Sequence, residues 1–209
     1  MAPTYKLSYF NFSGLGEPIR FLLHYGNIHF EDKRFNAKEF VQDIKPNTPA
    51  GQVPTLELEN GKVLFQSIPI CRYLGKKLGL SGDNDLENWE IDAVADTLND
   101  LRLKIALWKY NTNSTEQKRL KEDLDNKVLP FYLPLLESWA KKGNGYLANG
   151  KLSWVDFYFA GVIDYLNYFM EQDLLESYPS LQAVKKNVFS LPSVREYVAT
   201  RPIDDLKNI

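Results

Sequence analysis

The chain has 209 residues, of which 44% are hydrophobic, a formal net charge of -2 and a single cysteine. Basic and acidic residues are interspersed, which argues against nucleic acid and against an anionic membrane surface as partners. One cysteine excludes an internal disulfide, and two histidines without a Cys/His cluster argue against a structural zinc site. No leader-like segment opens the chain and no segment has the ~18 consecutive apolar residues of a membrane span, so we expect a cytoplasmic protein.

The first eighty residues combine strand and helix patterns. Asn60-Gly61 between two apolar segments is a strong hairpin signal, and Ser67 and Gly79 are suited to cap and end the helix that follows. The elements predicted in chain order are a strand at 5–9, helices at 17–25 and 38–44 on either side of a strand at 30–35, strands at 55–59 and 62–65, and a helix at 68–78. This βαβαββα order predicts an α/β domain over residues 1–80.

The rest of the chain, residues 86–209, has helical periodicity and predicts an all-α domain. A long first helix carries apolar residues at three-to-four spacing from Ile91 to Trp108. Ser114–Gln117 has a capping-box pattern and begins a second helix, which Pro130 and Pro134 should kink. Ser153 and Asp156 form another box ahead of an apolar helix that reaches Phe169, typical of the middle of a bundle. Shorter helices are expected at 181–189 and 192–199.

Tyr9 is the residue most suited to chemistry. It ends the first strand, just before a glycine-bearing turn and the N-terminus of the helix that contains Pro18. Small ligands with anionic ends bind at this position in α/β sheets. A phenol has a pKa near 10, so it stays protonated at neutral pH and donates a hydrogen bond.

Two further motifs suggest a ligand site, and each also has a purely structural interpretation. Val53-Pro54 enters a strand, where a cis bond would expose the backbone of Val53 to an extended peptide-like ligand; it can equally be an edge-strand proline. Gln66 and Ser67 precede a helix and could bind a carboxylate, although most serines at such positions are only caps.

Together these features resemble the cytosolic glutathione transferases, most closely the sigma class that includes insect enzymes and haematopoietic prostaglandin D synthases. The likeness covers essentially the whole chain. The resemblance implies a thioredoxin-like N-terminal domain, an all-helical C-terminal domain that contributes the hydrophobic substrate site, and a homodimer. The matching segments are Tyr5–Phe10, Gly16–Arg20, Gly51–Pro54, Gln66–Ser67 with Ile70–Leu74, and Leu152–Tyr158.

The resemblance also implies roles for individual residues. Tyr9 would bind the glutathione sulfur, Gln66 and Ser67 the γ-glutamyl carboxylate, and Val53 the cysteinyl backbone, with Lys45 near the glycyl end. The full predicted glutathione site consists of Tyr9, Leu15, Phe40, Val41, Lys45, Gln52, Val53, Pro54, Gln66, Ser67 and Asp100 of the partner subunit.

Three departures from the family pattern stand out. Phe40-Val41 replaces the tryptophan that usually lies beside the glycyl carboxylate. Leu15 stands where the prostaglandin synthases carry arginine, and Asn99 replaces one of three aspartates, leaving Asp96 and Asp100.

The chemistry follows from the resemblance and from the properties of a thiol. A thiol with a pKa of about 8.5 is mostly protonated at neutral pH, whereas the thiolate is the nucleophile. A donor such as Tyr9 that favours the thiolate therefore activates glutathione, the expected co-substrate, without a metal. The thiolate would attack hydrophobic electrophiles, such as lipid peroxidation products, in a detoxification reaction. The predicted apolar site, whose helical members could equally be core residues, comprises Phe12, Gly14, Leu15, Leu103, Leu107, Tyr158 and Val162.

Three alternatives remain open. The same thiolate could isomerise a prostaglandin endoperoxide, which Leu15 and Asn99 weaken. A non-enzymatic, crystallin-like ligand-binding protein could use the same scaffold, although no extra segment is apparent between Trp108 and Glu116 and the predicted glutathione residues are present. Cys71 could be a catalytic thiol, but its place on the apolar stripe of a helix favours a structural role.

Overall fold

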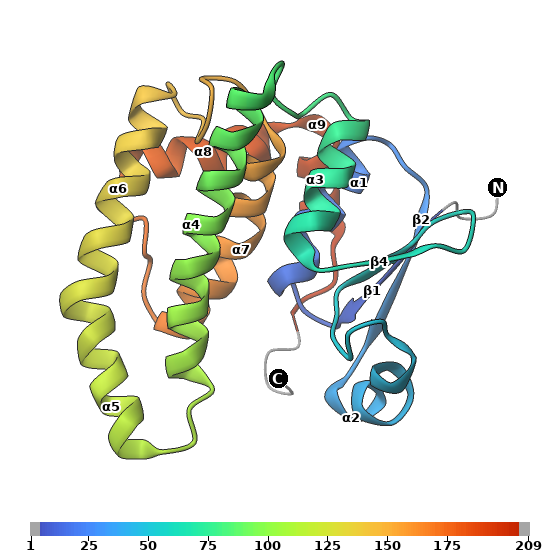
Figure 1. Ribbon diagram of the computed structural model, residues 1–209, viewed down its shortest axis with the longest axis horizontal. Helices are drawn as coiled ribbons and strands as arrows, with labels where there is room; N and C mark the ends of the chain where they lie inside the picture. The colour runs from blue at the N-terminus through green and yellow to red at the C-terminus, as the bar shows by residue number, and fades with distance from the viewer. Residues whose placement is uncertain (1–4, 205–209) are drawn as a thin grey trace.

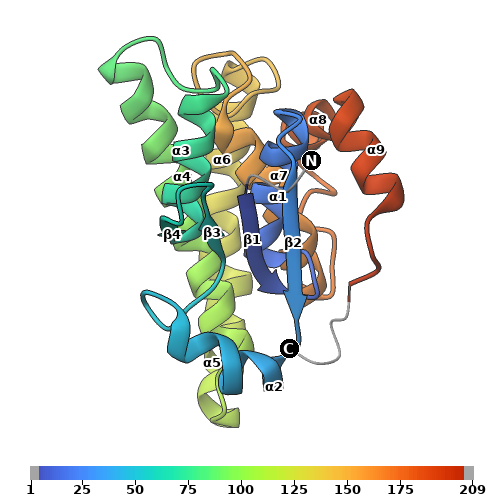
Figure 2. The ribbon, with the colours of Figure 1, turned by 90° about the vertical axis from the view of Figure 1, so that its right-hand side faces the viewer.

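The computed structural model describes residues 5–204, and its N-terminal half is built on a four-stranded sheet in the order β2-β1-β3-β4 (Figure 2). β1 and β2 pair in parallel, placing Tyr9 opposite Arg34, and β3 runs antiparallel to β1. β3 and β4 form the predicted hairpin around Asn60-Gly61, where Gly61 has a positive φ of 78°. The strands are β1 (Tyr5–Phe10), β2 (Phe30–Phe35), β3 (Thr55–Glu57) and β4 (Val63–Phe65).

Two helices, α1 (Glu17–Tyr25) and α3 (Ser67–Lys77), lie against one face of the sheet (Figure 2). The predicted helix at 38–44 is a sequence of short turns: α2 (Ala37–Glu39), a π-helical turn η2 (Phe40–Ile44) and a 3-10 turn η3 (Lys45–Asn47). The thioredoxin-like order of elements predicted from the sequence is confirmed.

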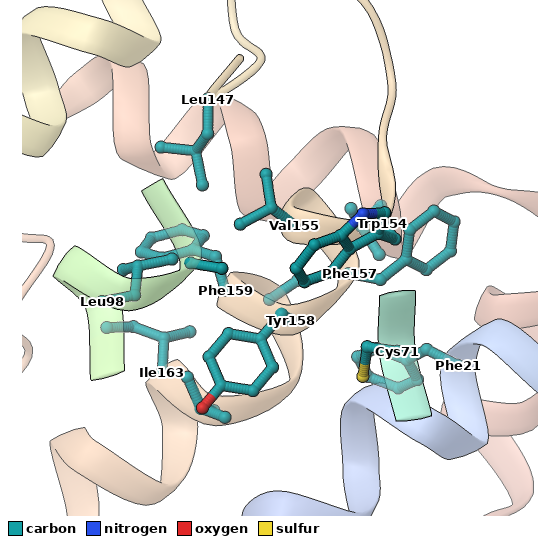
Figure 3. Close-up of a cluster of buried hydrophobic side chains, with 14 of the residues drawn as sticks. Phe21, Cys71, Leu98, Leu147, Trp154, Val155, Phe157, Tyr158, Phe159 and Ile163 are labelled. Carbon is teal, nitrogen blue, oxygen red and sulfur yellow. The ribbon is translucent and has the colours of Figure 1, made fainter. Parts of the chain in front are cut away.

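The second half is helical, as predicted, and α7 lies at its centre with almost every side chain buried (Figures 1 and 3). Asp156 fixes the start of α7, because its carboxylate accepts hydrogen bonds from the backbone N–H of Ser153 and of Leu147, both at 2.8 Å. The helices are α4 (Asp85–Lys109), α5 (Ser114–Asp123), α6 (Leu129–Lys142), α7 (Trp154–Met170), α8 (Pro179–Ser190) and α9 (Pro192–Thr200).

The structure corrects two predicted caps. Ser67 is the first residue of α3, and Gln66 occupies the N-cap position with φ 69° and no capping hydrogen bond from its side chain. At α5 the cap is Asn113, whose side chain accepts from the N–H groups of Thr115 and Glu116, and not Ser114. Asparagine is at least as good an N-cap as serine, so the helix begins at Ser114 with its donors already satisfied.

The second predicted helix is also interrupted and not merely kinked. A π-helical turn, η4 (Leu124–Val128), separates α5 from α6, and Pro130 follows in the first turn of α6. Because proline has no backbone N–H, the regular hydrogen-bond ladder cannot continue through it. Pro134, in contrast, is accommodated within α6.

The two halves meet along α7, which packs on α1 and α3 (Figure 1). Gly161 is essential to this contact, since a Cβ there would lie 2.6 Å from the backbone nitrogen of Pro18. A Cβ on Gly75 of α3 would likewise lie 2.6 Å from the Cβ of Trp154. The backbone of α1, just after the Tyr9 turn, therefore rests directly on α7. The division at residues 80 and 86 remains a prediction.

Candidate active site

Tyr9 lies near the end of β1 and is held by the turn that follows. Its hydroxyl oxygen accepts a hydrogen bond of 3.0 Å from the backbone N–H of Leu15. A Cβ on Gly14, whose φ is 43°, would lie 2.7 Å from that oxygen, and a Cβ on Gly16 would lie 2.6 Å from the Cδ1 of the ring. The two glycines thus allow the turn to close tightly around the phenol.

Burial controls the protonation of Tyr9, which is only 4% exposed. The loss of solvation raises its pKa well above the ordinary value, and the hydrogen bond from Leu15 opposes this rise only in part. The phenol therefore keeps its proton at physiological pH. The Leu15 N–H donates to the hydroxyl oxygen, so the hydroxyl proton itself can be donated to a separate acceptor.

A cavity of about 520 Å³ lies beside this turn and brings together residues from distant parts of the chain. Leu15 lines this cavity, whereas Tyr9 lies behind it and is hydrogen-bonded to Leu15. Most of the predicted glutathione residues line this cavity: Leu15, Phe40, Lys45, Gln52, Val53, Pro54, Gln66 and Ser67. Phe10, Ala50, Gly51, Phe65, Arg102 and Leu103 complete it.

One side of the cavity presents backbone groups. The Val53–Pro54 peptide bond is cis, which is one of the two conformations that the sequence suggested. Among the hydrogen bonds recorded within residues 5–204, none involves the backbone N–H or C=O of Val53. These two groups can pair with an extended ligand in the manner of an added strand.

The start of α3 forms another part of the cavity wall. Gln66 has the positive φ of 69°, a conformation that costs a residue with a side chain on the order of 1 kcal/mol. The backbone is thereby turned so that Gln66 Nε2 donates to Gln52 Oε1 at 3.4 Å, and Ser67 opens the helix. A helix N-terminus with free N–H groups binds carboxylates.

Comparison with known proteins identifies the family of this fold. Residues 12–77 match the model of the glutathione S-transferase N-terminal domain, and residues 99–201 match that of the C-terminal domain. The chain is 47% identical over 204 residues to a glutathione S-transferase of Anopheles gambiae, with 98% of this chain and 100% of the relative covered. The chain belongs to the glutathione S-transferase family.

Other relatives of this glutathione S-transferase agree with the assignment. Glutathione S-transferase S1 of Drosophila melanogaster is 43% identical, with 97% of this chain and 81% of the relative covered. The solved structure of prostaglandin synthase D of Nilaparvata lugens has a TM-score of 0.91 and 43% identity, covering 96% of this chain and 100% of that one. The predicted family and fold are confirmed, and the protein is an enzyme of a family that uses glutathione as co-substrate.

Arg102 is the main residue of this transferase that sequence reasoning missed. It lies on α4 and lines both the cavity of about 520 Å³ and a neighbouring cavity of about 540 Å³, which Asp96 and Asn99 also line. Its Nε and Nη2 atoms donate to Asn99 Oδ1 at 3.0 and 2.9 Å. No local pattern marks it, because α4 carries several charged residues and neighbouring positions on a helix point in different directions.

Two tyrosines were missed as well. The hydroxyl oxygens of Tyr110 and Tyr165 are 3.4 Å apart, and the ring of Phe12 stacks on Tyr165 with centroids 6.0 Å apart. Phe12 also packs edge-on against Tyr9, with ring centroids 5.4 Å apart. Tyr165 is therefore linked through Phe12 to the ring of Tyr9.

Several predicted residues lie outside the two cavities. Val41 is 63% exposed, and Leu107 and Asp100 also face solvent. Tyr158 and Val162 are buried in the core (Figure 3 shows Tyr158 near Cys71). Burial raises the pKa of Tyr158 to about 12. The oxygen of Tyr158 is buried without a hydrogen-bond partner among the described residues.

Cys71 is fully buried, and burial raises the pKa of its thiol, so its environment does not favour a thiolate. Within residues 5–204, no group of three or more His, Cys, Asp or Glu side chains could hold a metal ion. No helix in the same range is long and apolar enough to cross a membrane.

Proposed function

We propose that this enzyme conjugates glutathione to hydrophobic electrophiles, and that the Tyr9 hydroxyl stabilises the glutathione thiolate. One observation carries the proposal. Tyr9 Oη accepts from Leu15 N–H, which leaves its own proton free beside the cavity that collects the predicted glutathione residues. Such a donor binds a thiolate more strongly than a thiol, and each tenfold preference lowers the thiol pKa by about one unit.

The reaction then needs no nucleophile from the protein. Glutathione loses its thiol proton to solvent, and the sulfur lone pair attacks the electrophile, forming a carbon–sulfur bond. A leaving group departs with its electron pair, or an activated double bond takes up a proton. The role of Tyr9 is electrostatic throughout, because its raised pKa keeps the proton on the phenol oxygen.

The cavity suggests how glutathione is oriented. Its γ-glutamyl carboxylate would bind at the N-terminus of α3, on Ser67 and Gln66, and its cysteinyl backbone would pair with Val53. Lys45 and Gln52 remain for the glycyl carboxylate. Phe40 packs edge-on against Phe10, with ring centroids 5.1 Å apart, and offers an apolar wall without an N–H donor.

Replacing the strained cap tests this orientation. Gln66→Ala should raise the KM for glutathione about tenfold and lower kcat much less, since the lost contacts are made equally in the ground state and the transition state. Steady-state kinetics at fixed saturating electrophile measure both values. Lys62→Ala, an exposed change on the nearby hairpin, is the control. An unchanged KM in Gln66→Ala would remove the start of α3 from the glutathione site.

The far side of the cavity favours an electrophile that carries an oxygen. Leu15 and Leu103 supply apolar surface and Arg102 supplies donors, whereas the hydroxyls of Tyr110 and Tyr165 lie outside the cavity lining. An α,β-unsaturated aldehyde derived from a lipid has both an apolar tail and a carbonyl that such donors can polarise. We therefore place lipid peroxidation products among the substrates, which is the detoxification role expected for a cytoplasmic enzyme.

A panel of electrophiles tests the function. With glutathione, the enzyme should conjugate an aryl halide and a long-chain alkenal, and without glutathione it should do neither. Arg102→Met should reduce turnover of the alkenal at least about fivefold more than that of the aryl halide, which has no carbonyl to polarise. Equal losses for the two substrates would remove Arg102 from carbonyl recognition, and glutathione binding without conjugation would favour the crystallin-like alternative.

Isomerisation of a prostaglandin endoperoxide is the second candidate, favoured by the likeness to the prostaglandin synthase D structure. Leu15 and Asn99, where the prostaglandin synthases have arginine and aspartate, argue against it. An endoperoxide arm in the same panel separates the two activities.

We also propose a homodimer in which Asp100 reaches the γ-glutamyl amine in the partner's cavity. Its exposure on α4, outside the cavities of its own chain, supports this arrangement.

A further inference from the structure

A buried arginine is hydrogen-bonded to the backbone of the turn that holds Tyr9. Arg20 of α1 is fully buried, and its Nη1 donates to the carbonyl oxygens of Phe12 at 3.0 Å and Ser13 at 3.4 Å. Its Nη2 reaches the carbonyl of Phe10 at 3.5 Å. Nη1 also pairs with the carboxylate of Glu17 at 3.1 Å. The turn is therefore attached to an ionic cluster.

This cluster is completed from the other end of the chain. The second oxygen of Glu17, Oε1, pairs with Arg201 Nη1 at 2.5 Å, and Tyr197 Oη donates to Glu17 Oε2 at 3.2 Å. Arg34 Nη2 in turn donates to Tyr197 Oη at 3.2 Å. A buried carboxylate between two guanidinium groups is stable only while both partners remain in place.

A second attachment lies one residue before the glycine of the turn. Ser13 is 3% exposed, and its Oγ donates to Asp204 Oδ2 at 2.6 Å. The segment after α9 passes along this side of the molecule (Figure 2). Ser13 precedes Leu15, the donor to Tyr9, by two residues. The position of that donor is thus coupled to a carboxylate 191 residues from Ser13 in the sequence.

We infer that Tyr197, Arg201 and Asp204 form a C-terminal latch that positions the Leu15–Tyr9 donor pair for thiolate stabilisation. The inference rests on the proposed role of Tyr9. The latch residues do not line the glutathione cavity, so they act on the rate through the turn and not on the binding of the tripeptide.

Variants at the Ser13–Asp204 contact test the latch while the buried Glu17 cluster stays intact. At a pH below the thiol pKa, we expect kcat/KM for an electrophile to fall about three- to tenfold in Ser13→Ala and in Asp204→Asn. The apparent pKa of bound glutathione, titrated by thiolate ultraviolet absorbance, should rise by the corresponding half to one pH unit, about 1.4 kcal/mol per unit. The KM for glutathione should stay within about twofold.

Asp125→Asn is a matched control, because it also removes a hydrogen-bonded carboxylate, the partner of Lys121 at 2.6 Å, but on η4 far from Tyr9. Asp204→Asn is also introduced into Tyr9→Phe. If the latch acts through Tyr9, Asp204→Asn should not change the thiol pKa further when the Tyr9 hydroxyl is already absent. A general loosening of the fold would change the thiol pKa in both backgrounds.

The outcomes separate the two proposals. If Tyr9→Phe raises the thiol pKa but Ser13→Ala and Asp204→Asn titrate like Asp125→Asn, the latch is wrong and the role of Tyr9 stands. If Tyr9→Phe titrates like the wild type, the role of Tyr9 is wrong and the latch falls with it. Equal effects of Asp204→Asn with and without the Tyr9 hydroxyl would also overturn the latch.

Discussion

Tyr9→Phe should lower kcat for aryl halide conjugation about 100-fold and leave the KM for glutathione nearly unchanged. The substitution removes one donor aimed at a developing or resident negative charge, a change that typically costs two to three orders of magnitude in rate. In the wild type the pKa of Tyr9 is raised by burial, so the phenol does not titrate in the working range and the pH–rate profile should follow the thiol alone. In the variant that profile should move toward the value of a free thiol, about 8.5.

Tyr5→Phe provides the matched control. Tyr5 lies on the same buried face of β1, and its hydroxyl is also hydrogen-bonded, accepting from Lys77 Nζ at 2.6 Å, but away from the cavity. The Tyr5→Phe variant should conjugate glutathione to the aryl halide at nearly the wild-type rate. If the two variants show the same pH–rate profile, Tyr9 does not stabilise the thiolate.

The largest effect on stability is expected from Asp156→Ala. The change leaves the N–H groups of Leu147 and Ser153 without acceptors at the buried start of α7, which should lower the free energy of unfolding by about 2–4 kcal/mol. Urea denaturation, compared through midpoints at constant slope, measures the loss. Asn113→Ala removes a cap at the exposed start of α5 and should cost only about 1 kcal/mol.

The same variant has a pH signature. Burial raises the pKa of Asp156 to about 6, above the value of about 3.9 in an unfolded chain. Between these values the folded protein retains a proton that the unfolded chain releases, so the contribution of Asp156 is full below about pH 4 and declines as the pH rises through 6. The deficit of Asp156→Ala relative to wild type should therefore be larger at pH 5 than at pH 7.5. A deficit that grows with pH would mean that its pKa is lowered.

The sequence was sufficient for those parts of the fold and site that depend on local chemistry. α1 is delimited by Pro18 and Gly26, and α7 by the box of Ser153 and Asp156, so both helices begin where predicted. Eight of the residues predicted to bind glutathione line the cavity of about 520 Å³, and short motifs mark Val53, Gln66 and Ser67 among them; their role stays a prediction. The exchange of caps at α5 reflects the similar capping ability of Asn113 and Ser114, which pattern alone cannot rank. At α3 the positive φ of Gln66 shifts the helix start by one residue, and sequence pattern does not reveal a backbone conformation of this kind.

The parts that the sequence did not reveal depend on contacts between distant segments. Arg102 is one charged residue among many on α4, and nothing local distinguishes its cavity position from a solvent-exposed one. The pair of Ser13 and Asp204 joins opposite ends of the chain. Conversely, Tyr158 and Val162 were assigned to a cleft because the inward side of a central helix and its cleft side have the same apolar pattern.

The absence of a side chain at Gly161 limits how this enzyme can evolve. Because Pro18 occupies the space where a Cβ would extend, a larger residue there would force α1 away from α7, next to the turn that contains Leu15. The exposed flank of α4, with Leu103 and Leu107, is under no such packing constraint, so residues there can change while the contact between α1 and α7 is kept.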